Sequence, residues 1–284
     1  MPVASAQVKS SILFAALYAN GPSTIREKSQ TRDHTERIFD KFGIPIEISG
    51  SNENKLITVK PPKEIQPCEV EVCSDFSSAA FFILAALIVP NSHLIIRNVG
   101  INKTRTGLLS ALKEMGGYIN IMNISEGYEP TGDIEVKFSK LKGFNLNPKL
   151  VSNIIDELPV LFIAAALAEG ITKIRGVEEL RFKESDRLES MAQSLKLFGV
   201  DYILHPDGID IQGLNQTKFK YDERLPFKKA DINSFYDHRI AMACVMGALR
   251  SEGPCKIRNC DNFITSFPTF LDLTDQLGLN ITRL

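Results

Sequence analysis

The sequence contains no tryptophan and carries almost no net charge. With 33 basic and 34 acidic residues among 284, the formal net charge is −1. No global positive field is therefore available to hold nucleic acid or an anionic membrane. No basic stripe carries the interleaved aromatic side chains on which single-stranded nucleic acid stacks. Any anion that this chain binds must be held by a local cluster of residues.

Long hydrophobic runs are absent as well. Apolar runs such as residues 79–89 fall well short of the roughly 20 apolar residues that span a bilayer. No charged-then-apolar signal peptide opens the chain. We therefore expect a soluble protein with no membrane partner, located in the cytoplasm or in an organelle whose transit peptide is missing from this sequence.

Cysteine is scarce, and the sequence offers no convincing metal or cofactor motif. Cys68 with Cys73, and Cys255 with Cys260, share a C-x4-C spacing that is wider than the usual spacing in structural zinc sites. An odd cysteine count without a secretory signal favours reduced thiols. The dinucleotide, P-loop and zincin motifs do not occur either. We expect neither a metal nor a cofactor.

The sequence does contain an internal repeat of roughly 75 residues. Polar clusters near residues 7, 77, 157 and 237 each precede a short apolar run. Each run is apolar nearly all round, which predicts a helix buried on every side. A strand ending in Ile-Arg follows each run, and then an amphipathic helix that closes on glycine. A hairpin completes the first three units, and a strand such as residues 69–72 precedes some of the apolar helices.

The repeat predicts the fold class and the domain organisation. Its unit reads β-α-β-α-β-β, which predicts an α+β fold of the α/β repeat type, with buried inner helices. Prolines at 61, 62 and 67 mark a break, because proline resists both helix and central strand. We expect residues 1–68 to be the C-terminal remainder of a first domain and residues 69–284 to be a second domain of three repeats. The first unit lacks an opening strand, which indicates a truncated chain.

One stretch, residues 176–191, combines a helix start with clustered charge. Apolar residues at helical spacing from Leu188 to Phe198 predict an amphipathic helix, which Ser185 or Asp186 can cap. Lys183, Glu184 and Arg187 surround that cap. Cations beside unpaired N–H groups at a positive dipole end are typical of an anion site. A solvated, well-capped helix start is the alternative interpretation.

If the inner helices pack side by side, the polar clusters before them converge. The residues of these clusters that could handle anions or protons are Ser5, Gln7, Lys9, Ser29, Arg32, Asp156, Lys183, Glu184, Arg187, Asp237, His238 and Arg239. The arginines and Lys183 could bind phosphate or carboxylate. Asp156 and Glu184 would be a pair of carboxylates for acid–base work.

Helix capping offers a simpler interpretation for several of these residues. Asp156 could only complement a helix dipole, and residues 237–239 could be a solvent-facing cap. Residues 77–78 are interpreted as caps and close-packing residues. Asp33 with Glu36 fits a capping box.

These stretches together resemble the family of 5-enolpyruvylshikimate-3-phosphate (EPSP) synthases, the 3-phosphoshikimate 1-carboxyvinyltransferases. The similar segments are residues 4–10, 31–36, 156–159, 179–187 and 236–239. Their Lys-Glu-Ser-Asp-Arg and Asp-His-Arg motifs are the most specific, and the resemblance covers the whole chain in order. It implies two domains of three repeats each, closing over a cleft faced by helix N-termini.

The resemblance also implies an activity and a set of roles. The family transfers the enolpyruvyl group of phosphoenolpyruvate to the 5-hydroxyl of shikimate 3-phosphate, without a metal cofactor, and its members are usually monomers. Residues that would hold shikimate 3-phosphate are Ser5, Ala6, Gln7, Ser29, Arg32, Asp156 and Lys183. Residues that would contact phosphoenolpyruvate are Gln7, Arg187 and Arg239. Asp156 would lie at the 5-hydroxyl, and Glu184 would deliver and remove the methylene proton.

The sequence departs from the family pattern in two places, and two alternatives stay open. Thr265 stands where many members carry lysine, and the family's N-terminal Lys-Ser segment, Asn-Ala-Gly-Thr loop and early arginine have no counterpart. The chain resembles the C-terminal two-thirds of the enzyme, so a separate N-terminal segment is a possible partner. The alternatives are the sister transferase acting on UDP-N-acetylglucosamine and a non-catalytic fragment. The two specific motifs favour the shikimate enzyme.

Overall fold

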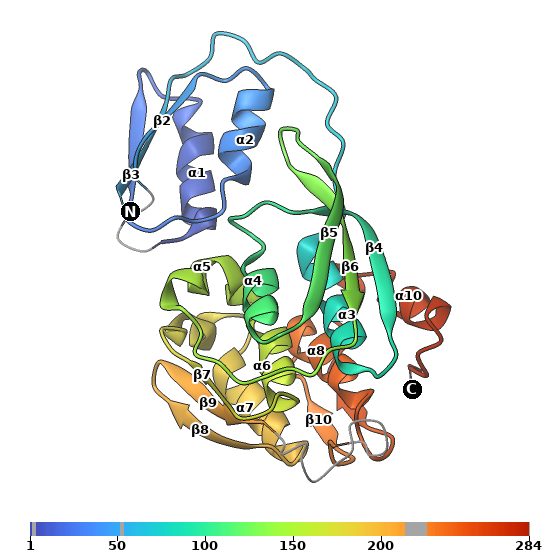
Figure 1. Cartoon of the computed structure of the whole chain (residues 1–284). Helices are drawn as coiled ribbons and strands as arrows, with labels where there is room; N and C mark the ends of the chain where they lie inside the picture. The colour runs from blue at the N-terminus through green and yellow to red at the C-terminus, as the bar shows by residue number, and fades with distance from the viewer. Residues whose placement is uncertain (2–3, 52–53, 214–225, 284) are drawn as a thin grey trace.

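Two hydrophobic cores of unequal size organise the chain. The computed structural model describes residues 1, 4–51, 54–213 and 226–283. The smaller core is built from side chains between residues 13 and 59, and the larger from side chains between residues 76 and 270. Residues 61–73, which join them, form neither helix nor strand. Figure 1 shows the two units, connected at the top by this extended segment. We retain the predicted division at residue 68 as a proposal.

The first three sequence repeats each contain a three-stranded antiparallel sheet, and the strand order is the same in all three. The sheets are β1 (Ser23–Glu27), β3 (Asn54–Val59), β2 (Ile46–Ser51); β4 (His93–Gly100), β6 (Thr131–Lys137), β5 (Tyr118–Ser125); and β7 (Ile171–Ile174), β9 (Gly208–Gln212), β8 (Asp201–His205). In the fourth repeat β10 (Asp231–Asn233) pairs in parallel with β11 (Lys256–Arg258). The predicted succession of inner helix, strand, outer helix and hairpin is confirmed, although β4 continues beyond Ile96-Arg97 to Gly100 and β7 ends at Ile174.

The helices alternate between inner and outer positions. The inner helices are α1 (Ala6–Ala16), α3 (Phe76–Ile88), α6 (Leu158–Ala166) and α8 (His238–Ala248). The outer helices are α2 (His34–Lys41), α4 (Gly107–Glu114), α7 (Arg187–Leu197) and α10 (Phe270–Gln276). Short helical turns are η1 (Pro148–Leu150), α5 (Val151–Ile154), η2 (Ile155–Glu157), η3 (Glu178–Phe182) and α9 (Phe263–Ser266). Within the described ranges, no helix combines the length and apolar character needed to cross a membrane.

Glycine ends the outer helices, as the sequence predicts. The glycines after α2, α4, α7 and α10 all have positive φ: 67° at Gly43, 92° at Gly116, 85° at Gly199 and 68° at Gly278. A left-handed residue at this point lets the chain turn back while the last carbonyls are still bonded. The chain then enters the next strand or loop of the same repeat.

The inner helices of the larger unit are buried on every side, but α1 is not. Helices α3, α6 and α8 pack on one another, and every residue of α6 is buried. On α1, by contrast, Val8 is 48% exposed, Ile12 39% and Phe14 51%. The prediction of complete burial is wrong for this helix, because its own sheet and α2 cover only one of its faces.

The predicted strand at residues 69–72 is absent as well. A single parallel bridge, Ser74 to Val99, replaces it. The β4 ladder shifts register between Ile96 and Val99, and Asn98 between them has a φ of 51°. A bulge of this kind interrupts the row of unpaired backbone groups that a neighbouring strand would need.

Candidate functional site

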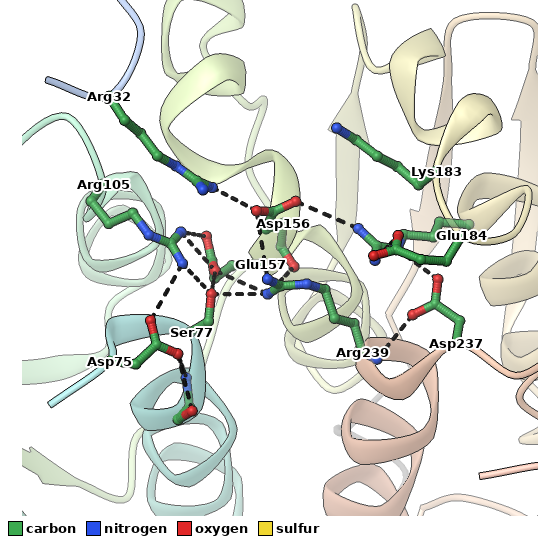
Figure 2. A network of polar contacts seen from close by, with 12 residues as sticks. Arg32, Asp75, Ser77, Arg105, Asp156, Glu157, Lys183, Glu184, Asp237 and Arg239 are labelled. Carbon is green, nitrogen blue, oxygen red and sulfur yellow. Dashed lines mark hydrogen bonds and ion pairs between the residues drawn. The ribbon is translucent and has the colours of Figure 1, made fainter. Parts of the chain in front are cut away.

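The polar clusters of the repeats meet at Asp156. This residue lies in η2, immediately ahead of α6. Three arginines from three different repeats approach its carboxylate. Arg32 Nη2 lies 2.6 Å from Oδ2, Arg187 Nη1 lies 3.5 Å from Oδ1, and Arg239 Nη2 lies 3.5 Å from Oδ2. Figure 2 shows Arg32 and Arg239 approaching Asp156 from different sides. The predicted meeting of Arg187 and Arg239 with Asp156 is confirmed.

The arginines decide the ionisation state of Asp156. Burial by itself would raise its pKa, but the neighbouring guanidinium groups of Arg239 and Arg32 outweigh burial and hold the pKa well below its ordinary value. The carboxylate is therefore ionised at neutral pH. Three cations surround this carboxylate, and they also pair with Asp237, Glu184 and Glu157. An anionic ligand would therefore bind by replacing carboxylates as partners of the guanidinium groups.

Arg187 is fixed in place by acids on both sides. Its side chain is 1% exposed, its Nε donates to Asp237 Oδ2 at 2.7 Å, and its Nη2 donates to Glu184 Oε2 at 2.5 Å. Asp237 also caps α8 by accepting from the backbone N–H of Arg239 at 2.9 Å. Asp237 thus has a second role beyond the predicted cap, because it orients Arg187.

Arg239 is held from the α6 side of the cluster. Its Nη1 donates to Ser77 Oγ at 2.9 Å and to the backbone oxygen of Asp156 at 3.2 Å. The neighbouring His238 has a lowered pKa, first because it is buried and second because Arg239 is close. His238 is therefore neutral at neutral pH and adds no cation to the cluster.

Glu184 and Lys183 border the cluster from the segment before α7. Glu184 is 52% exposed and shares Arg187 with Asp156, so two carboxylates flank one guanidinium. Lys183 Nζ contacts Glu179 Oε1 at 2.5 Å. An exposed acid beside a buried cation can exchange protons with a ligand that the cation holds.

The N-terminal unit contributes Arg32 directly, whereas its other predicted site residues lie nearby. Ser5 caps α1, accepting from Val8 N at 3.3 Å; Gln7 and Ser29 are exposed. In the part of the chain that the structure describes, no hydrogen bond joins Ser5, Ala6, Gln7 or Ser29 to the Asp156 cluster. Figure 1 shows that α1 and α2 begin at the end of their unit that faces α4 and α5.

Two predictions for this unit are wrong. Lys9, a candidate for the polar cluster, is fully buried, with its Nζ 3.2 Å from Glu27 and 2.7 Å from Glu36. Asp33 and Glu36 form no capping box: the Asp33 side chain makes no cap bond and instead accepts from Asn102 Nδ2 at 2.6 Å. A buried ammonium needs its carboxylates, and this need outweighs the cap.

Three residues of the cluster, Arg105, Ser77 and Glu157, were not predicted as site residues. Ser77 was interpreted as a cap or close-packing residue, but Asp75 caps α3 and Ser77 bonds within the cluster. Arg105 Nη1 lies 3.0 Å from both carboxylate oxygens of Glu157, and its Nη2 donates to Ser77 Oγ. The repeat holds a signal that would have found this arginine. Arg32 precedes α2, Arg105 precedes α4 and Arg187 begins α7, so each of the first three repeats has an arginine at the start of its outer helix.

A pocket elsewhere is less suited to this chemistry. A cavity of about 420 Å³ lies beside β5 and β6, lined by residues that include Glu71, Cys73, Tyr128, Glu129 and Asp133. It contains no residue of the Asp156 cluster, and its lining has three acids and no cation. No group of three or more metal-ligating side chains occurs among the described residues. We therefore place the candidate site at Asp156.

Comparisons with known sequences give one consistent result. The profile of the family described as EPSP synthase (3-phosphoshikimate 1-carboxyvinyltransferase) matches residues 1–273. A 3-phosphoshikimate 1-carboxyvinyltransferase of Hydrogenovibrio crunogenus is 44% identical over 99% of this chain and 62% of its own length. One of Methylococcus capsulatus is 43% identical over 99% of this chain and 61% of its own length. The chain thus spans less than two-thirds of the curated relatives it matches.

Comparisons with solved structures agree. An EPSP synthase from Acinetobacter baumannii superposes with a TM-score of 0.89 and 43% identity, over 98% of this chain and 61% of that one. The enolpyruvyl transferase NikO from Streptomyces tendae superposes with a TM-score of 0.71 at 20% identity, over 95% of this chain and 58% of that one. The second similarity concerns the fold alone.

Proposed function

The chain belongs to the EPSP synthase family, and we propose on this premise that it takes part in transferring the enolpyruvyl group of phosphoenolpyruvate to the 5-hydroxyl of shikimate 3-phosphate. The observation that carries the proposal is the convergence of Arg32, Arg187 and Arg239 on Asp156. Both substrates carry phosphate and carboxylate groups, and the planar guanidinium fork binds these groups in two-point contacts.

In the proposed site, Arg187 and Arg239 bind phosphoenolpyruvate. Arg187 reaches the cluster with its Nη atoms while Asp237 holds its Nε, so its orientation is set before a ligand arrives. The anionic groups of phosphoenolpyruvate would take the place of Asp156 and Glu184 as partners of the Nη atoms. Preorganised cations of this kind stabilise charge that develops during the reaction.

Shikimate 3-phosphate would lie toward the N-terminal unit. Arg32 lies on that side of Asp156, and Lys183, from the larger unit, lies on the opposite side (Figure 2). The other residues proposed to hold this substrate are Ser5, Ala6, Gln7 and Ser29. Ser152 Oγ donates to the backbone oxygen of Gln30 at 3.1 Å, which links the loop next to Ser29 to the larger unit.

The reaction requires a proton to move at two atoms. The oxygen of the 5-hydroxyl forms a bond to C2 of phosphoenolpyruvate and loses its proton near Asp156, while C3 gains a proton and becomes a methyl group. Phosphate then leaves C2 as one proton leaves C3, which restores the double bond. We assign the proton transfer at C3 to Glu184, because it is exposed toward a ligand and bonded to Arg187.

We further propose that full turnover needs the remainder of the family's fold, which the longer relatives contain and this chain does not span. Cations from that remainder would complete the phosphoenolpyruvate side, where Thr265 stands in place of the family lysine. The same proposal places the activity in the cytoplasm, without nucleic acid, with one copy of this chain and one copy of that remainder as the working unit.

Calorimetric titration of the chain separates this function from its alternatives. We expect shikimate 3-phosphate to bind and UDP-N-acetylglucosamine not to bind. Arg32→Gln should weaken shikimate 3-phosphate binding about tenfold, since a charge-assisted hydrogen bond is lost. The control is Arg97→Gln, whose side chain is mostly exposed and pairs with Asp133. Binding of the nucleotide sugar alone would favour the sister transferase, and binding of neither would favour a non-catalytic role.

A further inference from the structure

Arg105 is buried beside the site, and the proposed mechanism makes no use of it. Its side chain is 10% exposed and it pairs with Glu157, whose side chain is 1% exposed. We propose that Arg105, acting through Ser77 and Glu157, is a positioning residue that keeps Arg239 available for the anionic substrate. This inference deepens the proposed function and rests on it.

Ser77 connects the two arginines. A hydroxyl has one hydrogen to donate and two lone pairs that accept. Ser77 Oγ donates to Glu157 Oε1 at 2.5 Å and accepts from Arg239 Nη1 at 2.9 Å. The remaining lone pair accepts from Arg105 Nη2. All three positions are filled (Figure 2), so the orientation of Arg239 depends on that of Arg105.

Glu157 gives the second link, through charge. Its buried carboxylate lies 3.0 Å from Arg105 Nη1 and 3.4 Å from Arg239 Nη1. A buried carboxylate requires a compensating cation. Arg105 supplies it at the shorter distance, which leaves the charge of Arg239 for a ligand. Without Arg105, Glu157 would draw Arg239 toward itself.

Glu157 also fixes the backbone of the site. It directly follows Asp156 and precedes the first residue of α6. The backbone oxygen of Asp156 accepts from Arg239 Nη1 at 3.2 Å. The contact of Arg105 with Glu157 therefore affects both Asp156 and Arg239.

The proposal predicts an unusual order of variants. Arg105→Met removes the compensating cation, so Glu157 captures Arg239, and phosphoenolpyruvate affinity should fall about tenfold or more, the value of a charge-assisted bond. The double variant R105M/E157Q also removes the carboxylate that captures Arg239, so it should recover most of that affinity. Ser77→Ala keeps the charges of Arg105 and Glu157 but removes the hydrogen bonds through Ser77 Oγ. This variant provides the test if R105M fails to fold.

The measurement uses the whole chain labelled with ¹⁵N-arginine. The Nη signals of Arg239 are assigned by comparison with Arg239→Lys. In the wild type the two signals should be resolved from each other, because several hydrogen bonds hold the guanidinium group in one orientation. They should shift in R105M and return in R105M/E157Q, and titration with phosphoenolpyruvate gives the affinities. The control is Arg175→Met, which removes an ion pair of 2.7 Å with Asp210 away from the site and should change neither readout.

Each outcome decides the question. Unchanged Arg239 signals and unchanged affinity in both R105M and S77A would overturn the positioning role. A double variant as weak as R105M would do so too, because loss of structure alone gives no recovery. If the wild type does not bind phosphoenolpyruvate while the Arg239 signals change as expected, the positioning role stands, and what fails is the proposal that this chain binds phosphoenolpyruvate through Arg187 and Arg239.

Discussion

At the scale of single residues, the two acids that flank Arg187 differ in a way that suits different tasks. Asp156 is mostly buried among three arginines, whereas Glu184 is half-exposed and bonded to one. Strong electrostatic stabilisation keeps Asp156 ionised, and an acid that must gain and lose a proton needs a weaker hold. This contrast supports assigning the C3 proton transfer to Glu184.

Glu184→Gln and Lys183→Met should separate proton transfer from binding. In an enzyme completed with the N-terminal part of a relative, Glu184→Gln keeps the side-chain shape and should lower turnover by roughly 10²–10⁴, the usual value of a positioned acid–base group. Lys183→Met should raise the apparent constant for shikimate 3-phosphate and change turnover less. Steady-state phosphate release measures both. Full turnover by Glu184→Gln would move the proton transfer to another residue.

Asp156 should make the stability of the chain depend on pH. Its pKa in the folded chain is lowered, so its contribution to the free energy of unfolding is complete above the unfolded pKa of about 3.9 and declines as the pH falls below it. Urea unfolding of wild type and Asp156→Asn should therefore show a constant difference in the free energy of unfolding between pH 7 and pH 5, and this difference should begin to narrow as the pH falls below about 4. Asp231→Asn, at an exposed pair with Arg258, is the control and should show a smaller difference. A gap that stays constant over the whole pH range would contradict this assignment.

At the scale of helices and strands, the sequence predicts the elements well and their surroundings less well. Periodicity locates α7 and the glycines after the outer helices, because these features depend on local spacing and backbone conformation. Exposure of α1 depends on what packs against it, which spacing cannot reveal. The burial of Lys9 likewise depends on its ion pair with Glu27, a residue 18 positions away that only the fold brings close.

The same limit applies to the candidate site. Motifs identify Arg187, Glu184 and Arg239, since each lies at a recognisable helix start. Arg105 was missed because its importance comes from a buried carboxylate, Glu157, which sits 52 residues further along the chain. Comparison of equivalent positions in the repeats is the sequence signal that points to it.

The unequal burial of the inner helices gives a test at this scale. Leu161 in α6 is 0% exposed, so Leu161→Ala should lower the free energy of unfolding by about 2–5 kcal/mol through lost burial and the cavity left behind. Ile12→Ser on the open face of α1 should change it by less than about 0.5 kcal/mol, as exposed substitutions usually do. Denaturant unfolding of both variants makes the comparison. A large loss for Ile12→Ser would mean that the outer face of α1 is covered.

At the scale of the whole molecule, the two units are connected at the site itself. Besides the pair of Arg32 with Asp156, Asp33 accepts from Asn102, and His34 Nδ1 lies 3.1 Å from Glu129 Oε2. The beginning of α2 is therefore attached to the larger unit while the far face of α1 stays open. The arrangement places the start of α2 against the Asp156 cluster and leaves apolar side chains of α1 exposed.

That surface leads to the last prediction, that this chain acquires turnover when it is co-expressed with the segment of a relative that precedes the matched region. The exposed Val8 and Ile12, one helical turn apart, form an apolar patch on α1, and such patches promote association. We expect the chain alone to self-associate in analytical ultracentrifugation and to release little phosphate from phosphoenolpyruvate and shikimate 3-phosphate. The added segment should cover the patch, suppress self-association and exclude water from the reacting groups. Glu184→Gln with the same segment is the control, because it should form the complex without the turnover. Full turnover by the 284-residue chain alone would show that this prediction is wrong.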